Sequence, residues 1–412
     1  MADASTIRDV ALTTIGGGVT APRGFTAAAV HAGIKARAGV LDLTVVAAEQ
    51  ASAAAGLFTT NLAQAAPVLV SKDHLHRSGG LARAVVINSG CANACTGDAG
   101  MADAARMAAE VAAVLGCPAE QVLVASTGVI GVNLKIEAVA AGIRSAASSL
   151  APGTGSDVAR AIMTTDPFPK EHAVRVETAR GAFVVGGTAK GSGMIEPNMA
   201  TMIAMLTTDA RVPPALLRRA LTESARDTFN AITVDGECST NDTLFALASG
   251  SSGVAIDEAD YDVLLEAFLA VSRPLAVDIV RGGEGATKLI AITVRDARTR
   301  DDARQVARTI ANSPLVKTAV HGADPNWGRI VAAAGRAGVA FDIQRATVRV
   351  GDVLLFEHGL PHDDAASRAA EHLRGRDIRI DVSLGAGGSA AATIWTCDLT
   401  AEYVRINGEY RT

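Results

Sequence analysis

Aromatic residues and cysteines are scarce in this chain. Only 3% of its 412 residues are Phe, Trp or Tyr, so a hydrophobic core has to be built mainly from Ala, Val, Ile and Leu. The five cysteines are odd in number and scattered, which excludes a disulfide framework and offers no zinc-site spacing. These absences indicate a reduced protein, and we expect it in the cytoplasm.

Long apolar runs and a charge excess of one sign are also absent. No stretch of about 18 mostly apolar residues is present, so we expect no membrane span. Lys and Arg number 38 and Asp and Glu number 43, which gives a formal net charge of −5. This mild acidity gives no reason to expect a nucleic acid or an anionic membrane as a partner. The hydrophobic share of 49% indicates instead a folded protein with a sizeable core.

Apolar runs bounded by turn residues alternate with segments of helical periodicity. We expect strands over residues 41–47, 66–70, 84–87, 122–125, 202–206, 244–248, 289–294, 346–350 and 378–384. We expect helices over residues 99–115, 136–150, 213–229, 259–279 and 301–311. Because the alternation has no regular strand–helix–strand period, it favours an α/β fold of sheets covered by helices over a doubly wound nucleotide-binding fold.

The glycine-rich stretch that begins at Lys190 is not a nucleotide-binding motif. In Lys190-Gly191-Ser192 the glycine follows the lysine, whereas a phosphate-binding loop requires glycine before lysine. The stretch continues as a loop containing Gly and Pro, reaches Ala200 and Thr201, and runs directly into an apolar strand. The junction of loop and strand is therefore the unusual feature of this segment.

Thr201 stands at that junction and is open to two interpretations. A threonine hydroxyl is a weak nucleophile unless a base lies beside it. Cleavage of the Ala200–Thr201 peptide bond would give Thr201 a free α-amine, whose reference pKa of about 7.7–8.0 leaves a neutral fraction near neutral pH. That amine can accept the hydroxyl proton, as in enzymes with an N-terminal threonine nucleophile. The other interpretation is a threonine that merely begins a buried strand.

A second ingredient for acyl transfer follows another short buried strand, at Ser126-Thr127-Gly128. A threonine hydroxyl and a glycine N–H at a strand end can both donate to a developing oxyanion, and each such donor contributes about 10²–10³ in rate. A plain turn is the alternative for these residues taken alone.

The stretch KGSGMIEPNMATM at residues 190–202 resembles the processing-site signature of the ornithine acetyltransferase family, the glutamate N-acetyltransferases of arginine biosynthesis. The likeness extends over nearly the whole chain, in order and at suitable spacing. Further segments that carry it are residues 58–61, 66–69, 88–97, 126–131, 162–166, 233–243, 283–288, 313–319, 324–329 and 403–412. Each segment alone is weak evidence for the family, but together the segments make the resemblance specific.

The resemblance implies a precursor that cuts itself before Thr201 into an α chain of residues 1–200 and a β chain of residues 201–412. It implies an α/β fold of the N-terminal-nucleophile type, an αββα sandwich of two sheets flanked by helices, and an α2β2 assembly. Thr201 would take the acetyl group of N2-acetylornithine as a covalent intermediate and pass it to glutamate in a ping-pong reaction. The family uses neither a metal nor a cofactor for this transfer.

The resemblance also assigns site residues. Its oxyanion pair falls on Thr127 and Gly128. Its substrate-contacting positions match Thr164, Lys190, Thr201, Glu284, Asn407 and Thr412. Because the substrates are zwitterionic amino acids, Lys190 can pair with the α-carboxylate and Glu284 with an ammonium group. Asn407 and Thr412 can contribute only if the C-terminal tail folds back into the site, since ordinary tails fray.

Three alternatives stay open. Some members of the family also accept acetyl-CoA as a co-substrate and make N-acetylglutamate directly. A self-processing aminopeptidase or amidohydrolase would share the nucleophile and pass the acyl group to water. A scaffold that is never cut would have no activity.

Cys91 departs from the Asn or Gly that the family often has after Asn-Ser-Gly, and its effect on this loop is open.

Overall fold

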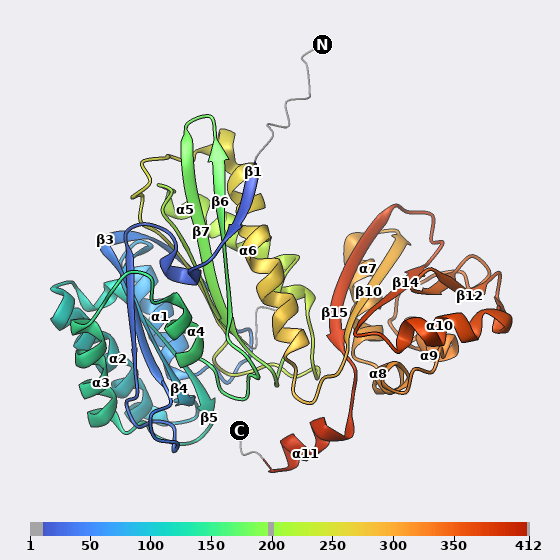
Figure 1. Ribbon diagram of the computed structural model, residues 1–412, viewed down its shortest axis with the longest axis horizontal. Helices are drawn as coiled ribbons and strands as arrows, with labels where there is room; N and C mark the ends of the chain where they lie inside the picture. The colour runs from blue at the N-terminus through green and yellow to red at the C-terminus, as the bar shows by residue number, and fades with distance from the viewer. Residues whose placement is uncertain (1–10, 197–201, 410–412) are drawn as a thin grey trace.

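Two β-sheets organise the part of the chain that the structure, a computed structural model, describes, namely residues 11–196 and 202–409 (Figure 1). The first sheet has nine strands and belongs to the larger unit, on the left of Figure 1. The second sheet has six strands and lies on the right, within residues 289–397.

Within the described residues, the larger unit combines the nine strands with six helices. In order along the sheet its strands are β1 (Ala11–Ile15), β6 (Lys170–Thr178), β7 (Gly181–Lys190), β8 (Ile203–Thr208), β9 (Thr243–Ala248), β3 (Leu43–Phe58), β4 (Leu81–Cys91) and β5 (Val122–Val129), and β2 (Phe25–Val30) also pairs with β3. Its helices are α1 (Ala66–Arg77), α2 (Gly97–Leu115), α3 (Ile136–Ser148), α4 (Gly155–Ala161), α5 (Pro214–Arg226) and α6 (Tyr261–Arg281). Short 3-10 turns occur at Gly18–Thr20, Ala119–Gln121, Phe229–Ala231 and Glu258–Asp260.

Strand β3 connects two halves of the nine-stranded sheet. Its first part pairs with β4 and its last part with β9, and the pairing with β4 shifts register between Ala47 and Ser52. The two halves pack against each other through one apolar cluster. That cluster contains Val46, Val85, Ile87 and Leu123 from one half and Ile203, Met205, Phe245 and Leu247 from the other. Irregular register bends a strand and allows one sheet to fold over itself.

Helices cover the outer faces of both halves. The apolar sides of α2 and α3 pack with the outer residues of β3, β4 and β5, together with the start of α1. The apolar sides of α5 and α6 pack with β6, β7, β8 and β9. Figure 1 shows the resulting order of helices, two sheet halves and helices. This αββα arrangement confirms the predicted fold class.

The smaller unit is a single sheet covered on one face. Its strands in order are β13 (Leu360–Pro361), β12 (Val353–Glu357), β11 (Thr347–Val350), β14 (Asp377–Ser383), β10 (Leu289–Ala297) and β15 (Ala390–Cys397). Its helices are α7 (Arg300–Ala311), α8 (Pro314–His321), α9 (Trp327–Gly335) and α10 (Ala366–Leu373), with a 3-10 turn at Asp363–Ala365. In β14 the residues Ile378, Ile380 and Val382 are buried under these helices, while Asp377 and Arg379 are exposed.

Two sequence expectations are wrong in detail. Residues 66–70 begin helix α1 and are not a strand; Pro67 occupies its first turn, where the missing N–H costs nothing, and a short apolar run does not distinguish a strand from a buried helix. Thr127 and Gly128 do not form a turn after a strand. They lie within β5, which continues to Val129 because it pairs in parallel with the end of β4.

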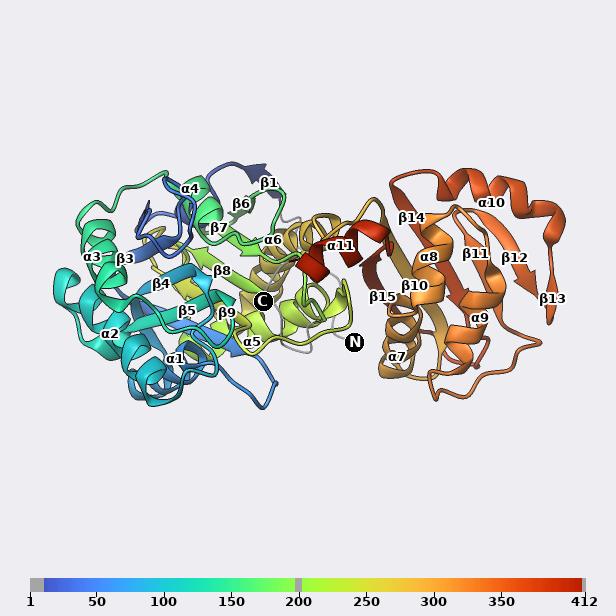
Figure 2. The same cartoon turned by 90° about the horizontal axis from the view of Figure 1, so that it is seen from below.

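The C-terminal segment returns from the smaller unit to the larger one. After β15 the chain forms helix α11 (Ala401–Glu409), which Figure 2 shows between the two units. Among the described residues, no helix combines the length and apolarity that a membrane crossing requires.

Candidate functional site

A cavity of about 150 Å³ lies in the larger unit, where β5 and β7 end and β8 begins. Six of the predicted site residues line it together: Thr127, Gly128, Thr164, Lys190, Glu284 and Asn407. Sequence reasoning missed other polar lining residues: Thr165, Asp235, Glu237, Ser239, Asn241, Asp242 and Tyr403. The predicted residues Ala200, Thr201 and Thr412 lie outside the described part of the chain, and Met202, which follows Thr201, lines the cavity.

Lys190 ends strand β7 and points its ammonium group at two predicted threonines. Its Nζ donates to Thr164 Oγ1 at 2.8 Å and to Thr127 Oγ1 at 3.2 Å. The side chain is not a surface charge, because only 8% of the residue is exposed. Burial lowers the pKa of Lys190, and the nearby carboxylate of Asp166 acts in the opposite direction. The lysine is thus a cation placed in a weakly solvated position beside two oriented hydroxyls.

Asp166 binds Gly191, which follows Lys190, as well as Thr164 and Lys170, and was not predicted as a site residue. Its Oδ1 accepts from Lys170 Nζ at 2.6 Å and from the Gly191 N–H at 2.7 Å, and its Oδ2 accepts from the Thr164 N–H at 3.0 Å. Burial alone would raise the pKa of this carboxyl, but the charges of Lys190 and Lys170 outweigh it and bring the pKa to about 2. The available signal was its place in the segment 162–166 that carries the family resemblance.

Gly128 occupies a position that only glycine fits. Its φ is +132°, and a Cβ there would collide with the carbonyl carbon of Gly90 and lie 2.5 Å from the nitrogen of Cys91. Asn241 fixes the same strand end, since its Nδ2 donates to the carbonyls of Ala92 at 2.6 Å and Ser126 at 2.8 Å. The end of β5 is therefore a rigid platform for Thr127 and Gly128, as an oxyanion site requires.

Helix α11 forms the opposite wall. Asn407 Nδ2 donates to Glu284 Oε2 at 2.9 Å, and the Tyr403 hydroxyl donates to Asp235 Oδ2 at 3.2 Å. Burial raises the pKa of Tyr403, and Asp235 raises it further, so the phenol stays protonated and remains a donor. The tail does fold back to the cavity, as the sequence prediction for Asn407 required.

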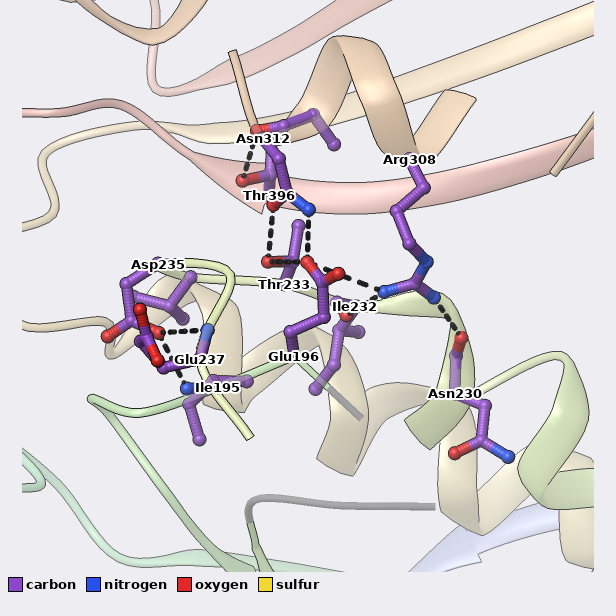
Figure 3. A network of polar contacts seen from close by, with 12 residues as sticks. Ile195, Glu196, Asn230, Ile232, Thr233, Asp235, Glu237, Arg308, Asn312 and Thr396 are labelled. Carbon is purple, nitrogen blue, oxygen red and sulfur yellow. Dashed lines mark hydrogen bonds and ion pairs between the residues drawn. The ribbon is translucent and has the colours of Figure 1, made fainter. Parts of the chain in front are cut away.

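The loop after β7 is held by a carboxylate and by neighbouring backbone. Asp235 accepts from the Met194 N–H at 2.7 Å and the Ile195 N–H at 2.8 Å, and Figure 3 shows Asp235 beside Ile195. Met194 has a φ of +57°, a left-handed conformation that these bonds help to maintain. On the far side of residues 197–201, the Met202 carbonyl accepts from the Thr243 N–H at 2.9 Å.

The charges that line the cavity have both signs. Four carboxylates belong to the lining, from Asp235, Glu237, Asp242 and Glu284, together with the ammonium of Lys190. Such a wall suits a small ligand that carries a cationic group and a carboxylate. Among residues 11–196 and 202–409, no group of three or more His, Cys, Asp or Glu side chains is arranged to hold a metal ion.

Cys91 lies beside this region, and its surroundings indicate a structural role. It is 5% exposed, and its Sγ donates to the Val132 carbonyl at 3.1 Å. Burial raises the pKa of the thiol, which disfavours the reactive thiolate. Cys91 therefore takes part in packing and adds no nucleophile to the cavity.

Comparison with known proteins identifies the family. The sequence profile of the ArgJ family matches residues 26–412. The arginine biosynthesis bifunctional protein ArgJ of Symbiobacterium thermophilum is 50% identical over 404 residues, 97% of this chain and 99% of its own length. The protein of the same name from Dehalococcoides mccartyi is 46% identical over 400 residues, 96% of this chain and 98% of its own. The crystal structure of ornithine acetyltransferase complexed with ornithine from Mycobacterium tuberculosis has 42% identity, covers 47% of this chain and 100% of that one, and gives a TM-score of 0.42. The chain therefore belongs to the ArgJ family.

Proposed function

We propose that this chain transfers an acetyl group from N2-acetylornithine to glutamate through an acetyl-Thr201 intermediate, after cutting itself between Ala200 and Thr201. Membership in the ArgJ family makes the chain an acetyltransferase of arginine biosynthesis and agrees with the resemblance drawn from its sequence. The observation that carries the proposed mechanism is the cavity. Its lining includes Lys190, the two threonines that Lys190 contacts, and four carboxylates. The strand that follows Thr201 begins at its edge.

Self-cleavage would create the nucleophile. The Thr201 hydroxyl attacks the Ala200 carbonyl carbon, the peptide C–N bond breaks, and the acyl group moves from nitrogen to oxygen. Water then hydrolyses the ester, which leaves a carboxylate on Ala200 and a free α-amine on Thr201. With a reference pKa of about 7.7–8.0, that amine can accept the proton of its own hydroxyl near neutral pH.

Acetyl transfer would follow in two steps. The Thr201 hydroxyl attacks the acetyl carbonyl of N2-acetylornithine, the amide C–N bond breaks, and ornithine leaves with the proton. The α-amine of glutamate then attacks the acetyl ester, N-acetylglutamate leaves, and the hydroxyl regains its proton. Thr127 is suited to the oxyanion in both steps, because its oxygen accepts from Lys190 and its own hydrogen stays available. The Gly128 N–H is the second proposed donor, each worth about 10²–10³ in rate.

The two charged residues would bind the two ends of the amino-acid substrates. We propose that Lys190, which lines the cavity, pairs with the α-carboxylate, and that Glu284, which accepts from Asn407, pairs with the side-chain ammonium of ornithine. Both are only 8% exposed, so these pairs would form with little screening by water.

Two threonines complete the proposed set of substrate contacts. The Thr164 hydroxyl accepts from Lys190 and keeps its own hydrogen available, so it can orient the acetyl amide of the substrate. Thr412 belongs to the set through the family resemblance and lies outside the described residues.

The proposed α chain (1–200) and β chain (201–412) would remain together after the cut. Strand β7 precedes the cut and β8 follows it, and the two are antiparallel neighbours from Val185↔Thr208 to Lys190↔Ile203. Separating the chains would break this pairing in the middle of the nine-stranded sheet. An α2β2 assembly, a cytoplasmic location and a reaction without metal or cofactor belong to the same proposal.

The experiment compares the wild type with a Thr201→Ala variant. It measures the intact mass of each purified protein under denaturing conditions and determines the N-terminal sequences. We expect two fragments from the wild type, the second beginning at Thr201, and an uncut variant. Transfer from N2-acetylornithine to glutamate should fall by at least about 10⁴-fold in the variant, as for removal of other activated nucleophiles. A wild type that stays uncut yet transfers acetyl groups would overturn the mechanism.

A second activity is favoured by one observation, the word bifunctional in the names of the relatives. The processed enzyme would then also make N-acetylglutamate from acetyl-CoA and glutamate. The cut protein incubated with acetyl-CoA and glutamate tests this directly. The same assay without glutamate measures release of acetate, which would favour the hydrolase alternative.

A further inference from the structure

Glu196 is the last described residue before the segment that contains the Ala200–Thr201 bond, and residues of both units hold its carboxylate. Glu196 Oε2 accepts from Thr233 Oγ1 at 2.9 Å and from Asn312 Nδ2, and Arg308 Nη1 lies 3.8 Å from it. Figure 3 shows these groups converging on the carboxylate. Arg308 lies in α7 and Asn312 directly follows it, so the smaller unit supplies two of these three partners.

The partners of Glu196 are themselves fixed. Arg308 Nη2 donates to the Asn230 carbonyl at 2.5 Å, and Thr233 Oγ1 also lies 2.8 Å from Asn312 Oδ1. Burial lowers the pKa of Arg308, and the charge of Glu196 acts against that shift. The side chains of Arg308 and Glu196 are 19% and 21% exposed, so this contact is largely shielded from solvent. Because these partners are already fixed, they lose little conformational freedom when they bind the Glu196 carboxylate.

The backbone around Glu196 is held as well. The Ile195 carbonyl accepts from the Val234 N–H at 2.7 Å, and the Glu196 N–H donates to the Glu237 carbonyl at 2.8 Å. With the bond from Thr243 to Met202, hydrogen bonds hold the described backbone on both sides of residues 197–201. Correct placement of reacting groups contributes strongly to reaction rates.

We propose that Glu196 is a positioning residue for self-cleavage, and that its ion pair with Arg308 and its hydrogen bond from Asn312 make cutting depend on the folded smaller unit. The carboxylate holds the entry to the scissile segment in place. The smaller unit, although it supplies none of the six described site residues that line the cavity, thereby takes part in forming the nucleophile. This inference rests on the self-cleavage proposed above.

The test measures the rate at which the two chains appear from precursor freshly made by cell-free translation. We expect Glu196→Ala and Arg308→Ala each to slow cutting about 10- to 100-fold, and the double variant to be no slower than the slower single one. Glu196→Gln keeps an acceptor oxygen for Thr233 and Asn312 and should cut at an intermediate rate. Arg304→Lys is the matched control, because Arg304 lies one turn earlier on α7, binds Asp227, and should cut like the wild type.

Two further measurements separate positioning from general stability. Glu196→Ala enzyme that has finished cutting should transfer acetyl groups with the wild-type kcat per cut chain. In the uncut Thr201→Ala background, Glu196→Ala should keep its unfolding temperature within a few degrees of the parent. Cutting of Glu196→Ala at the wild-type rate would overturn the inference, as would slow cutting that comes with an equal loss of turnover and stability. A wild type that is never cut would instead overturn the proposed self-cleavage, and the inference with it.

Discussion

Several charged side chains beside the cavity of the larger unit are buried, whereas those paired on the sheet of the smaller unit are exposed or half-buried. In the larger unit Asp166, Lys170 and Lys190 are buried beside the cavity, with Lys170 only 1% exposed. In the smaller unit the pairs Arg295–Asp381 and Arg379–Asp352 lie on the open face or rim of the sheet. Burying a charge is costly unless it is paired and hydrogen-bonded. The buried charges of the larger unit therefore lie where their desolvation cost is offset by mutual pairing, beside the cavity in which we propose that a substrate of mixed charge binds.

The buried charges of the smaller unit lie where it contacts the larger unit. Lys317 Nζ donates to the carbonyl of Val234, a residue of the larger unit. Asp398 accepts from Thr287 Oγ1 at 2.5 Å and from His321 Nδ1, if that nitrogen carries the proton, at 2.8 Å. Burial alone would raise the pKa of Asp398, but these hydrogen bonds lower it. Lys317 and Asp398 thus form buried polar contacts where the two units meet.

The largest difference in stability loss between the two units is expected for alanine substitution of one glycine in each. Gly128→Ala should cost more than about 4 kcal/mol or prevent folding, because the new Cβ meets backbone atoms of Gly90 and Cys91 at a φ of +132°. Gly335→Ala, at the end of α9, has nothing within 4 Å of its Cβ and should change stability by no more than about 1 kcal/mol. Thermal unfolding in the uncut Thr201→Ala background measures both. A Gly128→Ala protein of parental stability would contradict the described strand geometry.

A smaller effect is expected when one charge is removed from each unit. Asp166→Asn leaves Lys170 and Lys190 buried without their carboxylate and should cost about 3–5 kcal/mol. Asp381→Asn removes an exposed partner of Arg295 and should cost about 1 kcal/mol or less. Urea unfolding of the two variants in the Thr201→Ala background makes the comparison. Equal losses would show that the two units do not differ in this respect.

The smallest expected effect is a dependence on acid. The pKa of Asp166 is held near 2, below its unfolded value near 4, so its ionised form favours the folded state. That stability is fully present above about pH 4 and is lost as the pH falls towards about 2, an amount on the order of 2 kcal/mol. The difference in unfolding free energy between parent and Asp166→Asn should therefore shrink over this window, while the difference for Asp381→Asn should stay small throughout. A difference that is constant from about pH 7 to about pH 2 would contradict the assignment.

Much of the fold followed from local pattern, and the failures have a common cause. Helices such as 99–115 and strands such as 289–294 were found because burial on one face leaves a periodic signal. The run 66–70 was assigned wrongly because a helix start and a strand look alike over five apolar residues. Strand β7 contains several glycines and ends in the buried Lys190, and hydrophobic alternation did not reveal it.

The candidate site residues were named through a resemblance, and the structure shows which of the described ones lie together. Thr127, Thr164 and Lys190 were named from motifs, and the contacts between them follow only from the fold, which brings together β5, the segment between α4 and β6, and the end of β7. Asp166, Asp235 and Glu196 were missed, because each acts on backbone or side chains that local sequence cannot place beside it.

By itself, the sequence determined the family, the chemistry-bearing residue types and the layered α/β class, since ordered motifs and periodicity are local properties. The tertiary structure alone decided that Lys190 and Glu284 are buried, and that helix α11 returns to the cavity. It also decided that α7 of the smaller unit receives Glu196. These are contacts between residues far apart in the chain, and their energies depend on desolvation and shared partners that only the folded arrangement creates.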